Sequence, residues 1–184
     1  MLVEGALDAE AVRRAGNDLV PLGLCGTAIT AGHLQQLRDI DSAAVGRLIS
    51  ATDADTAGQG AVCRLWNLLT TEETATVRAA ALEPGTDPAD LVRAGRRTQL
   101  RGALVNDARP IIQAAIDVTL TGYDLEHVEG ALAGLRHIAA AIRGASPAVL
   151  AQATGHLTKR LADTTDYDVV VAEIVDAAAV RGPA

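Results

Sequence analysis

The sequence predicts an α/β fold with a parallel-sheet core and flanking helices, followed by an all-helical C-terminal segment. Short apolar runs alternate with amphipathic stretches through the first half of the 184 residues, which is typical of a parallel sheet covered by helices. The pattern changes at a Pro- and Gly-containing turn over 84–88, and beyond Pro110 only helical periodicity remains. Apolar residues make up 49% of the chain, enough to form a buried core.

In the first half, the expected strands are short and apolar, and the helices have recognisable boundary signals. Gly16 is a C-cap candidate for the first helix, and Thr30 is an N-cap candidate for the second. Right-handed crossovers would bring the carboxyl ends of the parallel strands to one edge of the sheet. The expected strands cover 2–3, 19–24, 45–51 and 74–82, and the expected helices cover 6–15, about 30–38 and 56–69.

The second half is expected to be helical. Pro88 suits the first position of a short helix, and Ser146 is an N-cap candidate after a helix–helix break. We assign residues 1–95 to a first domain and residues 96–184 to a helical C-terminal region. The main helices of that region are expected over 111–121, 125–142, 147–161 and 167–180.

Composition excludes several functional classes. The net charge of −7 disfavours general binding to nucleic acid, and an aromatic content of 2% leaves too few rings for base stacking. The two cysteines, Cys25 and Cys63, are far apart, which excludes a disulfide scaffold and a four-cysteine zinc site. A reducing, cytoplasmic setting is therefore expected. No apolar stretch approaches the length of about 18 residues that a membrane span needs, so no membrane partner is expected.

Acidic residues follow the expected strands at the points where the strands end. Glu4 follows the first strand, Asp53 and Asp55 follow the third, and Asp87 and Asp90 follow the fourth. If these carboxylates converge at one sheet edge, they need a cation to stay ionised together. Hard oxygen ligands favour Mg²⁺ or Mn²⁺, which would support phosphoryl transfer. The alternative is that these residues only cap helices and form turns.

Four segments occur in a fixed order along the first half of the chain. They are VEGALD at 3–8, LCGTAIT at 24–30, DADTAGQ at 53–59 and GTDPADLV at 85–92. In order and spacing over residues 1–115, they resemble the Toprim domain of bacterial DnaG-type primases. The resemblance implies a Toprim-type parallel-sheet core and metal-dependent nucleotidyl transfer.

The resemblance also implies roles for the acidic residues. Glu4 matches a glutamate proposed as general acid or base, and Asp53, Asp55 and Asp87 match metal ligands. Asp90 is a further candidate as metal ligand or supporting residue, although some relatives carry the second acid where this chain has alanine.

Other matching residues would contact the substrate or support the fold. Arg64, Gly26 and Thr27 match positions that contact phosphate or nucleic acid, and Asp8 matches a residue that we interpret as structural. The glycine that usually separates the two aspartates of the third segment is Ala54 here, a change that should not block metal binding.

The function implied by the resemblance is RNA primer synthesis in DNA replication, on a single-stranded DNA template with nucleoside triphosphates. The resemblance implies that a complete primase also carries a zinc-binding module and a basic subdomain that holds the template DNA. This sequence has neither a cysteine–histidine zinc pattern nor a basic groove, so we expect a fragment or subunit that needs other DNA-binding parts. A helicase or a separate DNA-binding primase segment is the expected partner. Two alternatives stay open: a stand-alone metal-dependent Toprim nuclease, and an inactive Toprim domain that acts as a partner-binding module.

Overall fold

The computed structural model describes residues 1–26, 28–52, 56–83 and 85–179. The chain divides into two compact units, Met1–Ile111 and Ile112–Ala184. The predicted domain boundary between residues 95 and 96 marks the end of the segment that resembles a Toprim domain, which is a different criterion from compactness. That boundary stays a prediction. None of the helices in the described ranges combines the length and the apolar character required to cross a bilayer.

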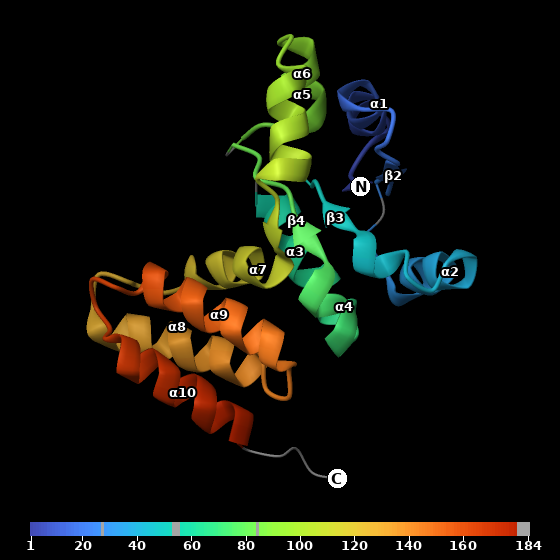
Figure 1. Cartoon of the computed structure of the whole chain (residues 1–184). Helices are drawn as coiled ribbons and strands as arrows, with labels where there is room; N and C mark the ends of the chain where they lie inside the picture. Colours follow the sequence, from blue (N-terminus) through green and yellow to red (C-terminus); the bar gives the residue numbers. More distant parts are fainter. Residues whose placement is uncertain (27, 53–55, 84, 180–184) are drawn as a thin grey trace. The chain divides into compact units, whose positions relative to one another are not determined.

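The first unit is built on a five-stranded sheet (Figure 1). Four strands pair in parallel in the order β2-β1-β3-β4, and β5 adds an antiparallel edge next to β4. This arrangement confirms the predicted fold class, while the antiparallel edge strand was not predicted. The strands are β1 (Leu2–Val3), β2 (Leu22–Gly23), β3 (Ile49–Ser50), β4 (Arg78–Ala79) and β5 (Arg109–Pro110).

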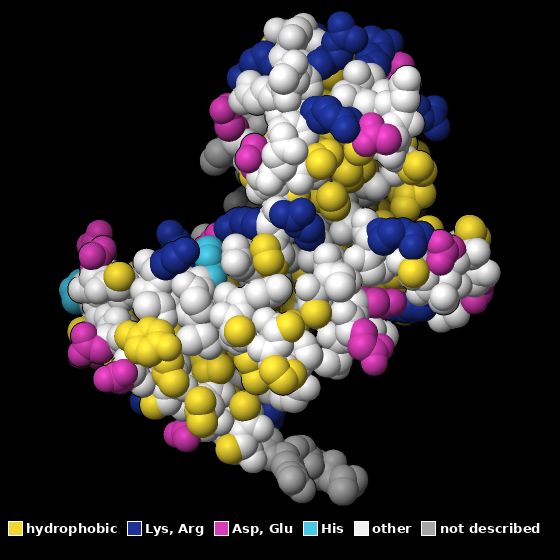
Figure 2. Space-filling view, viewed as in Figure 1, with side chains coloured by type: hydrophobic (Ala, Val, Ile, Leu, Met, Phe, Trp, Pro, Cys, Tyr) yellow, Lys and Arg dark blue, Asp and Glu magenta, His cyan; other side chains and the backbone are white. Residues whose placement is uncertain are grey.

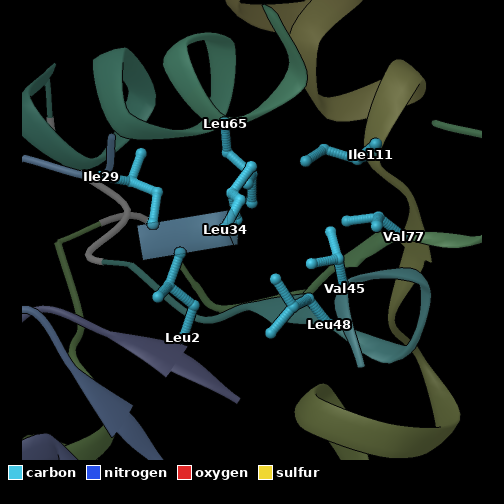
Figure 3. Packing of buried hydrophobic residues seen from close by; sticks show 8 residues of the cluster. All are labelled: Leu2, Ile29, Leu34, Val45, Leu48, Leu65, Val77 and Ile111. Carbon is cyan, nitrogen blue, oxygen red and sulfur yellow. The ribbon is translucent and has the colours of Figure 1, made fainter. Parts of the chain in front are cut away.

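Helices cover both faces of this sheet. Successive strand residues point to opposite faces, so Leu2 and Val3 of β1 belong to two different hydrophobic clusters. The cluster around Leu2 packs against Leu34 and Leu65 from α2 and α3 (Figure 3). The helices of this unit are α1 (Ala6–Ala15), α2 (Ala31–Ile40), α3 (Thr56–Leu68), α4 (Thr71–Thr76), α5 (Pro88–Arg93) and α6 (Arg97–Arg101).

The opposite face of the sheet carries the second cluster. Val3 packs there with Val12 of α1, Leu91 of α5 and Leu100 of α6. A π-helical turn, η2 (Gly102–Asn106), follows α6 and contributes Leu104 to the same cluster. The helices that follow β1 and β4 therefore lie together on one face of the sheet, where α1 packs against both α5 and α6.

Three of the predicted strands were wrong in part. The segment 74–82 begins as helix α4, because Thr70 and Glu73 form a capping box in which each side chain accepts the other residue's backbone N–H. The segment 45–51 begins as the 3₁₀ turn η1 (Val45–Arg47) and continues as the two-residue strand β3. The predicted strand over 19–24 is likewise reduced to the two residues of β2.

The second unit is helical, as predicted. Ser146 caps α9 by accepting a hydrogen bond from the Val149 N–H, and Pro147 occupies the first helical position. Asp117 of α7 accepts hydrogen bonds from His156 and Arg160 of α9 at 2.8 and 3.0 Å. The helices are α7 (Ile111–Leu120), α8 (Val128–Ala141), α9 (Pro147–Arg160) and α10 (Tyr167–Ala179), and α10 packs against α8 and α9.

Candidate functional site

The carboxyl ends of the parallel strands form one continuous hydrogen-bonded edge. Beyond the ends of β1 and β2, the Leu24 N–H donates to the Val3 carbonyl at 3.0 Å, and the Cys25 N–H donates to the Glu4 carbonyl at 2.8 Å. On the other side of β1, the Ala51 N–H donates to the Leu2 carbonyl at 2.8 Å. The first two sequence motifs therefore start side by side at this edge, and the chain leading into the third is paired with β1 as far as Ala51.

Glu4 and Gly5 form the turn between β1 and α1. Glu4 is half-buried directly after the strand, and Gly5 is the N-cap of α1. The Asp8 carboxylate Oδ2 accepts the Gly5 N–H at 3.2 Å, so the first turn of α1 closes back on the residue after Glu4. Glu4 is thus held at the edge by a strand on one side and a capped helix on the other.

Asp87 lies at the start of α5, where it is the N-cap residue. Its Oδ1 accepts the Asp90 N–H, and Pro88 at the first helical position has no N–H to satisfy. Asp8 reaches this helix too, because its Oδ1 accepts the Ala89 N–H at 3.3 Å. One buried carboxylate therefore joins the turn that follows Glu4 to the helix that follows Asp87.

Burial and the nearby Asp87 charge raise the pKa of Asp8 above its usual value, whereas the hydrogen bonds from Ala89 and Gly5 oppose that rise. Asp8 is 8% exposed. Carboxylates that repel each other in a partly desolvated setting are stabilised by a cation, which agrees with the predicted character of this edge.

Asp90 has a different environment from the other candidates. Its carboxylate forms an ion pair with Arg93, three residues further along α5. Its backbone N–H is the group that Asp87 caps. Asp90 thus has a structural partner, and its predicted role at a metal stays a prediction.

The third motif lies mostly outside the described residues, which include neither Asp53 nor Asp55. The residues that flank these two are described: Thr52 is buried, and its hydroxyl donates to the Gly58 carbonyl of α3 at 3.2 Å. In the described ranges, no group of three or more His, Cys, Asp or Glu side chains is arranged to hold a metal ion. Of the predicted metal ligands, the structure therefore describes Asp87 and the further candidate Asp90.

The predicted phosphate contacts are placed as follows. Gly26 has φ of 85° and follows Cys25 with φ of 50°, so the turn after β2 uses the left-handed region that glycine tolerates best. Thr27 lies outside the described residues. Arg64 is exposed on α3 and takes part in no ion pair within the described part of the chain. Their predicted roles stay predictions.

Arginines gather at the end of the first unit that holds α5 and α6 (Figure 2). Three of them pair with acids: Arg93 with Asp90, Arg96 with Glu83 and Arg101 with Asp18. These contacts agree with a solvated, ion-paired surface rather than an open phosphate-binding cluster.

The structure shows that Asp8 belongs to the candidate site, a role that the sequence analysis did not predict. Asp8 was interpreted as structural, yet it contacts a backbone amide 81 positions away, at Ala89. A sequence has no signal for a side-chain contact over that separation. The only local signal was its place three residues after Gly5, as expected of a carboxylate that caps the start of a helix.

Comparison with known proteins decides the family. The sequence profile of the family described as Toprim-like matches residues 1–92. The chain belongs to the Toprim-like family. Its Toprim domain resembles that of DnaG primase: the DNA primase of Mycobacterium tuberculosis is 34% identical over 140 residues, which are 74% of this chain and 21% of that protein. The chain thus spans about a fifth of the length of the curated primases it matches.

Solved primase structures share the fold. The RNA polymerase domain of Mycobacterium tuberculosis DnaG, in complex with a double-stranded DNA oligomer with a 6-nucleotide overhang, is 26% identical with a TM-score of 0.67. The match covers 88% of this chain and 51% of that one. A DnaG primase catalytic domain bound to single-stranded DNA is 23% identical with a TM-score of 0.57, covering 91% of this chain and 52% of that one, and it shows likeness of fold. Both matches extend beyond the Toprim segment, so the likeness includes helices of the second unit.

Proposed function

We propose that this Toprim domain is the catalytic part of a primase-type nucleotidyltransferase that makes RNA primers on single-stranded DNA. The observation that carries the proposal is the contact between two turns: Glu4 follows β1, Asp87 is the N-cap of α5, and Asp8 accepts hydrogen bonds from the nearby Gly5 and Ala89 amides. The likeness to DnaG primases supports primer synthesis over other Toprim reactions.

The donor chemistry of the edge fits a hard divalent cation. Glu4 and Asp87 supply carboxylate oxygens, which Mg²⁺ and Mn²⁺ prefer, and the repulsion between Asp8 and Asp87 would be relieved by positive charge. We propose that Asp53, Asp55 and Asp87 hold the ion or ions, with Asp90 as a further candidate. When bound, Mg²⁺ or Mn²⁺ would neutralise phosphate oxygens and stabilise the attacking and leaving oxygens.

The chain's own residues would then position the reactants. In nucleotidyl transfer, the 3′-hydroxyl oxygen of one nucleotide bonds to the α-phosphorus of a triphosphate, and the bond to the departing pyrophosphate breaks. Glu4 would accept the proton of the attacking hydroxyl. Arg64, Gly26 and Thr27 would contact phosphates of the triphosphate or the template, through a guanidinium and through backbone amides.

The net charge of −7 leaves little general attraction for DNA. We propose that a further DNA-binding segment or chain supplies the template contacts, and that a helicase is a candidate partner of the helical unit. The template, the triphosphates and the cytoplasmic setting are part of the same proposal.

Primer-synthesis and nuclease assays on single-stranded DNA with Mn²⁺ test the function. Wild type is expected to extend primers, and Glu4→Gln is expected to lose that activity by about 10²-fold or more, the usual contribution of a general base. Glu10→Gln is the matched control, because Glu10 is on the exposed side of α1 and pairs only weakly with Arg14. Cleavage without synthesis would favour a Toprim nuclease. Silence in both assays would point to a missing DNA-binding segment if wild type binds Mn²⁺, and to an inactive partner-binding module if it does not.

A further inference from the structure

Asp8 is a buried acid for which the proposed reaction has no chemical use. It is 8% exposed, and both of its carboxylate oxygens are engaged by backbone amides. Oδ2 accepts the Gly5 N–H at 3.2 Å, and Oδ1 accepts the Ala89 N–H at 3.3 Å. Each carboxylate oxygen of Asp8 thus accepts a hydrogen bond from the backbone of a different turn.

The contacts of Asp8 complete the first turn of α5. Backbone N–H groups at the start of a helix have no partner within the helix. Here Pro88 has no N–H, the Asp90 N–H is capped by Asp87, and the Ala89 N–H is capped by Asp8. Helix α5 is therefore capped both by its own N-cap residue Asp87 and by a side chain of a different helix, α1.

The contact of Asp8 with Gly5, in the turn after Glu4, is closely packed. Gly5 has no side chain, and a Cβ built on it would lie 3.3 Å from Asp8 Oδ2, so the turn leaves just enough room for the carboxylate. Because Gly5 follows Glu4 and Ala89 is two residues after Asp87, the Asp8 carboxylate bridges these two turns.

We propose that Asp8 is a positioning residue, whose carboxylate holds the Glu4 turn and the Asp87 turn at the separation that a divalent cation and a triphosphate require. The inference rests on the proposed function, since it assigns to Asp8 a part in the same edge. It differs from a general stabilising role because the two turns that Asp8 joins carry the candidate reactive groups.

Three substitutions separate position from charge. Asp8→Glu keeps the charge, and its longer side chain can still cap Gly5, but the carboxylate is displaced from the Ala89 amide. Asp8→Asn keeps the shape and one acceptor oxygen while losing the charge. Asp8→Ala loses both contacts. The matched control is Asp18→Asn, which removes the charge of a carboxylate beyond the C-terminal end of α1, where Asp18 pairs with Arg101 at 2.8 Å.

Calorimetric titration with Mn²⁺ is the measurement. Residues that orient a metal site typically change metal affinity by about 10- to 100-fold, so Asp8→Glu and Asp8→Ala are expected to weaken binding by about 10-fold or more. Asp8→Asn should weaken it by less, and Asp18→Asn should bind as wild type does. Fluorescence of Trp66, the one tryptophan of the chain, shows whether the first unit of each variant is folded.

The inference is overturned if Asp8→Glu binds Mn²⁺ like wild type while Asp8→Asn and Asp8→Ala bind weakly, because charge rather than position would then matter. Equal binding by all variants overturns it as well. Absence of Mn²⁺ binding by wild type would instead contradict the proposed function, so the two failures are distinguishable.

A second measurement needs no variant at Asp8. In the wild-type protein, titration with Mg²⁺ followed by NMR should shift the amide signals of Gly5 and Ala89 with one common midpoint, because the Asp8 carboxylate accepts a hydrogen bond from each amide and so couples the two turns. Separate midpoints, or a shift of one amide alone, would overturn the inference.

Discussion

A bidentate ion pair joins α2 to α4, and breaking it gives the sharpest stability prediction. Arg38 Nε and Nη2 donate to the two carboxylate oxygens of Glu73 at 2.7 and 2.8 Å. The side chains are 23% and 12% exposed. Glu73 also accepts the Thr70 N–H at 2.9 Å in the capping box of α4. The pair is thus shielded from solvent and geometrically constrained, unlike most surface ion pairs.

A double-mutant cycle with Glu73→Gln and Arg38→Met isolates the interaction. Gln retains the ability to cap α4, so the cycle reports mainly on the charged contact. Hydrogen bonds that involve charged groups contribute about 1.5–3 kcal/mol each, less where water reaches them. We therefore expect a coupling energy of about 1–3 kcal/mol at neutral pH. With a urea m-value of about 1–3 kcal/mol per M, the unfolding midpoint of each single variant should fall by about 1 M.

Urea unfolding followed by Trp66 fluorescence is the assay, because Trp66 packs against the core of the first unit. The hydrogen bond from Arg38 holds the pKa of Glu73 below its usual 4.5. This stabilisation is therefore fully present above that value and is lost as the pH falls through the lower folded-state pKa. The exposed pair Arg14–Glu10 is the control, with an expected coupling of about 0.5 kcal/mol or less. A coupling energy at Arg38–Glu73 no larger than the control's, or one unchanged in acid, would refute the reasoning.

Two further predictions concern thiol reactivity and the helical unit. Cys25 is exposed, whereas burial raises the pKa of the half-buried Cys63 thiol, so a disulfide reagent should modify Cys25 first and Cys63 faster as the pH rises. Cys25→Ser should remove the fast phase; a fast phase that survives would contradict the assignment. Asp117→Asn should lower the unfolding free energy of the second unit by about 1–2 kcal/mol, because it weakens the contacts of α7 with His156 and Arg160 of α9. Tyrosine absorbance reports this unit, since Tyr123 and Tyr167 both lie in it, and an unchanged urea midpoint would show that the contacts do not matter.

Helices were predicted well because their boundary signals are local. Thr30 and Ser146 cap the helices that the sequence assigned to them, and α1 has the predicted bounds Ala6–Ala15. The strands were harder, since each has two residues and little periodicity can be seen over so short a length. At α4, the β-branched residues near Thr74 suggested a strand, but the capping box at Thr70 and Glu73 favours the helix.

The candidate site was predictable to the extent that it depends on strand ends. A parallel sheet brings the residues after its strands to one edge, which is why the sequence predicts that Glu4 and the third motif lie at the same edge. The antiparallel strand β5 had no sequence signal, because its two residues include Pro110. The contact of Asp8 with Ala89 depends on how α1 and α5 pack, which only the folded chain determines.

The most direct test of the central claim is calorimetric titration of Mg²⁺ and Mn²⁺ into wild type and into the double variant Asp53→Asn/Asp55→Asn. The account predicts binding by wild type at about millimolar affinity or tighter, and loss of that binding in the double variant. Trp66 fluorescence should show that both proteins are folded. Wild-type protein that binds neither ion, or a folded double variant that binds them equally well, would contradict the claim that this edge is a metal-dependent catalytic site.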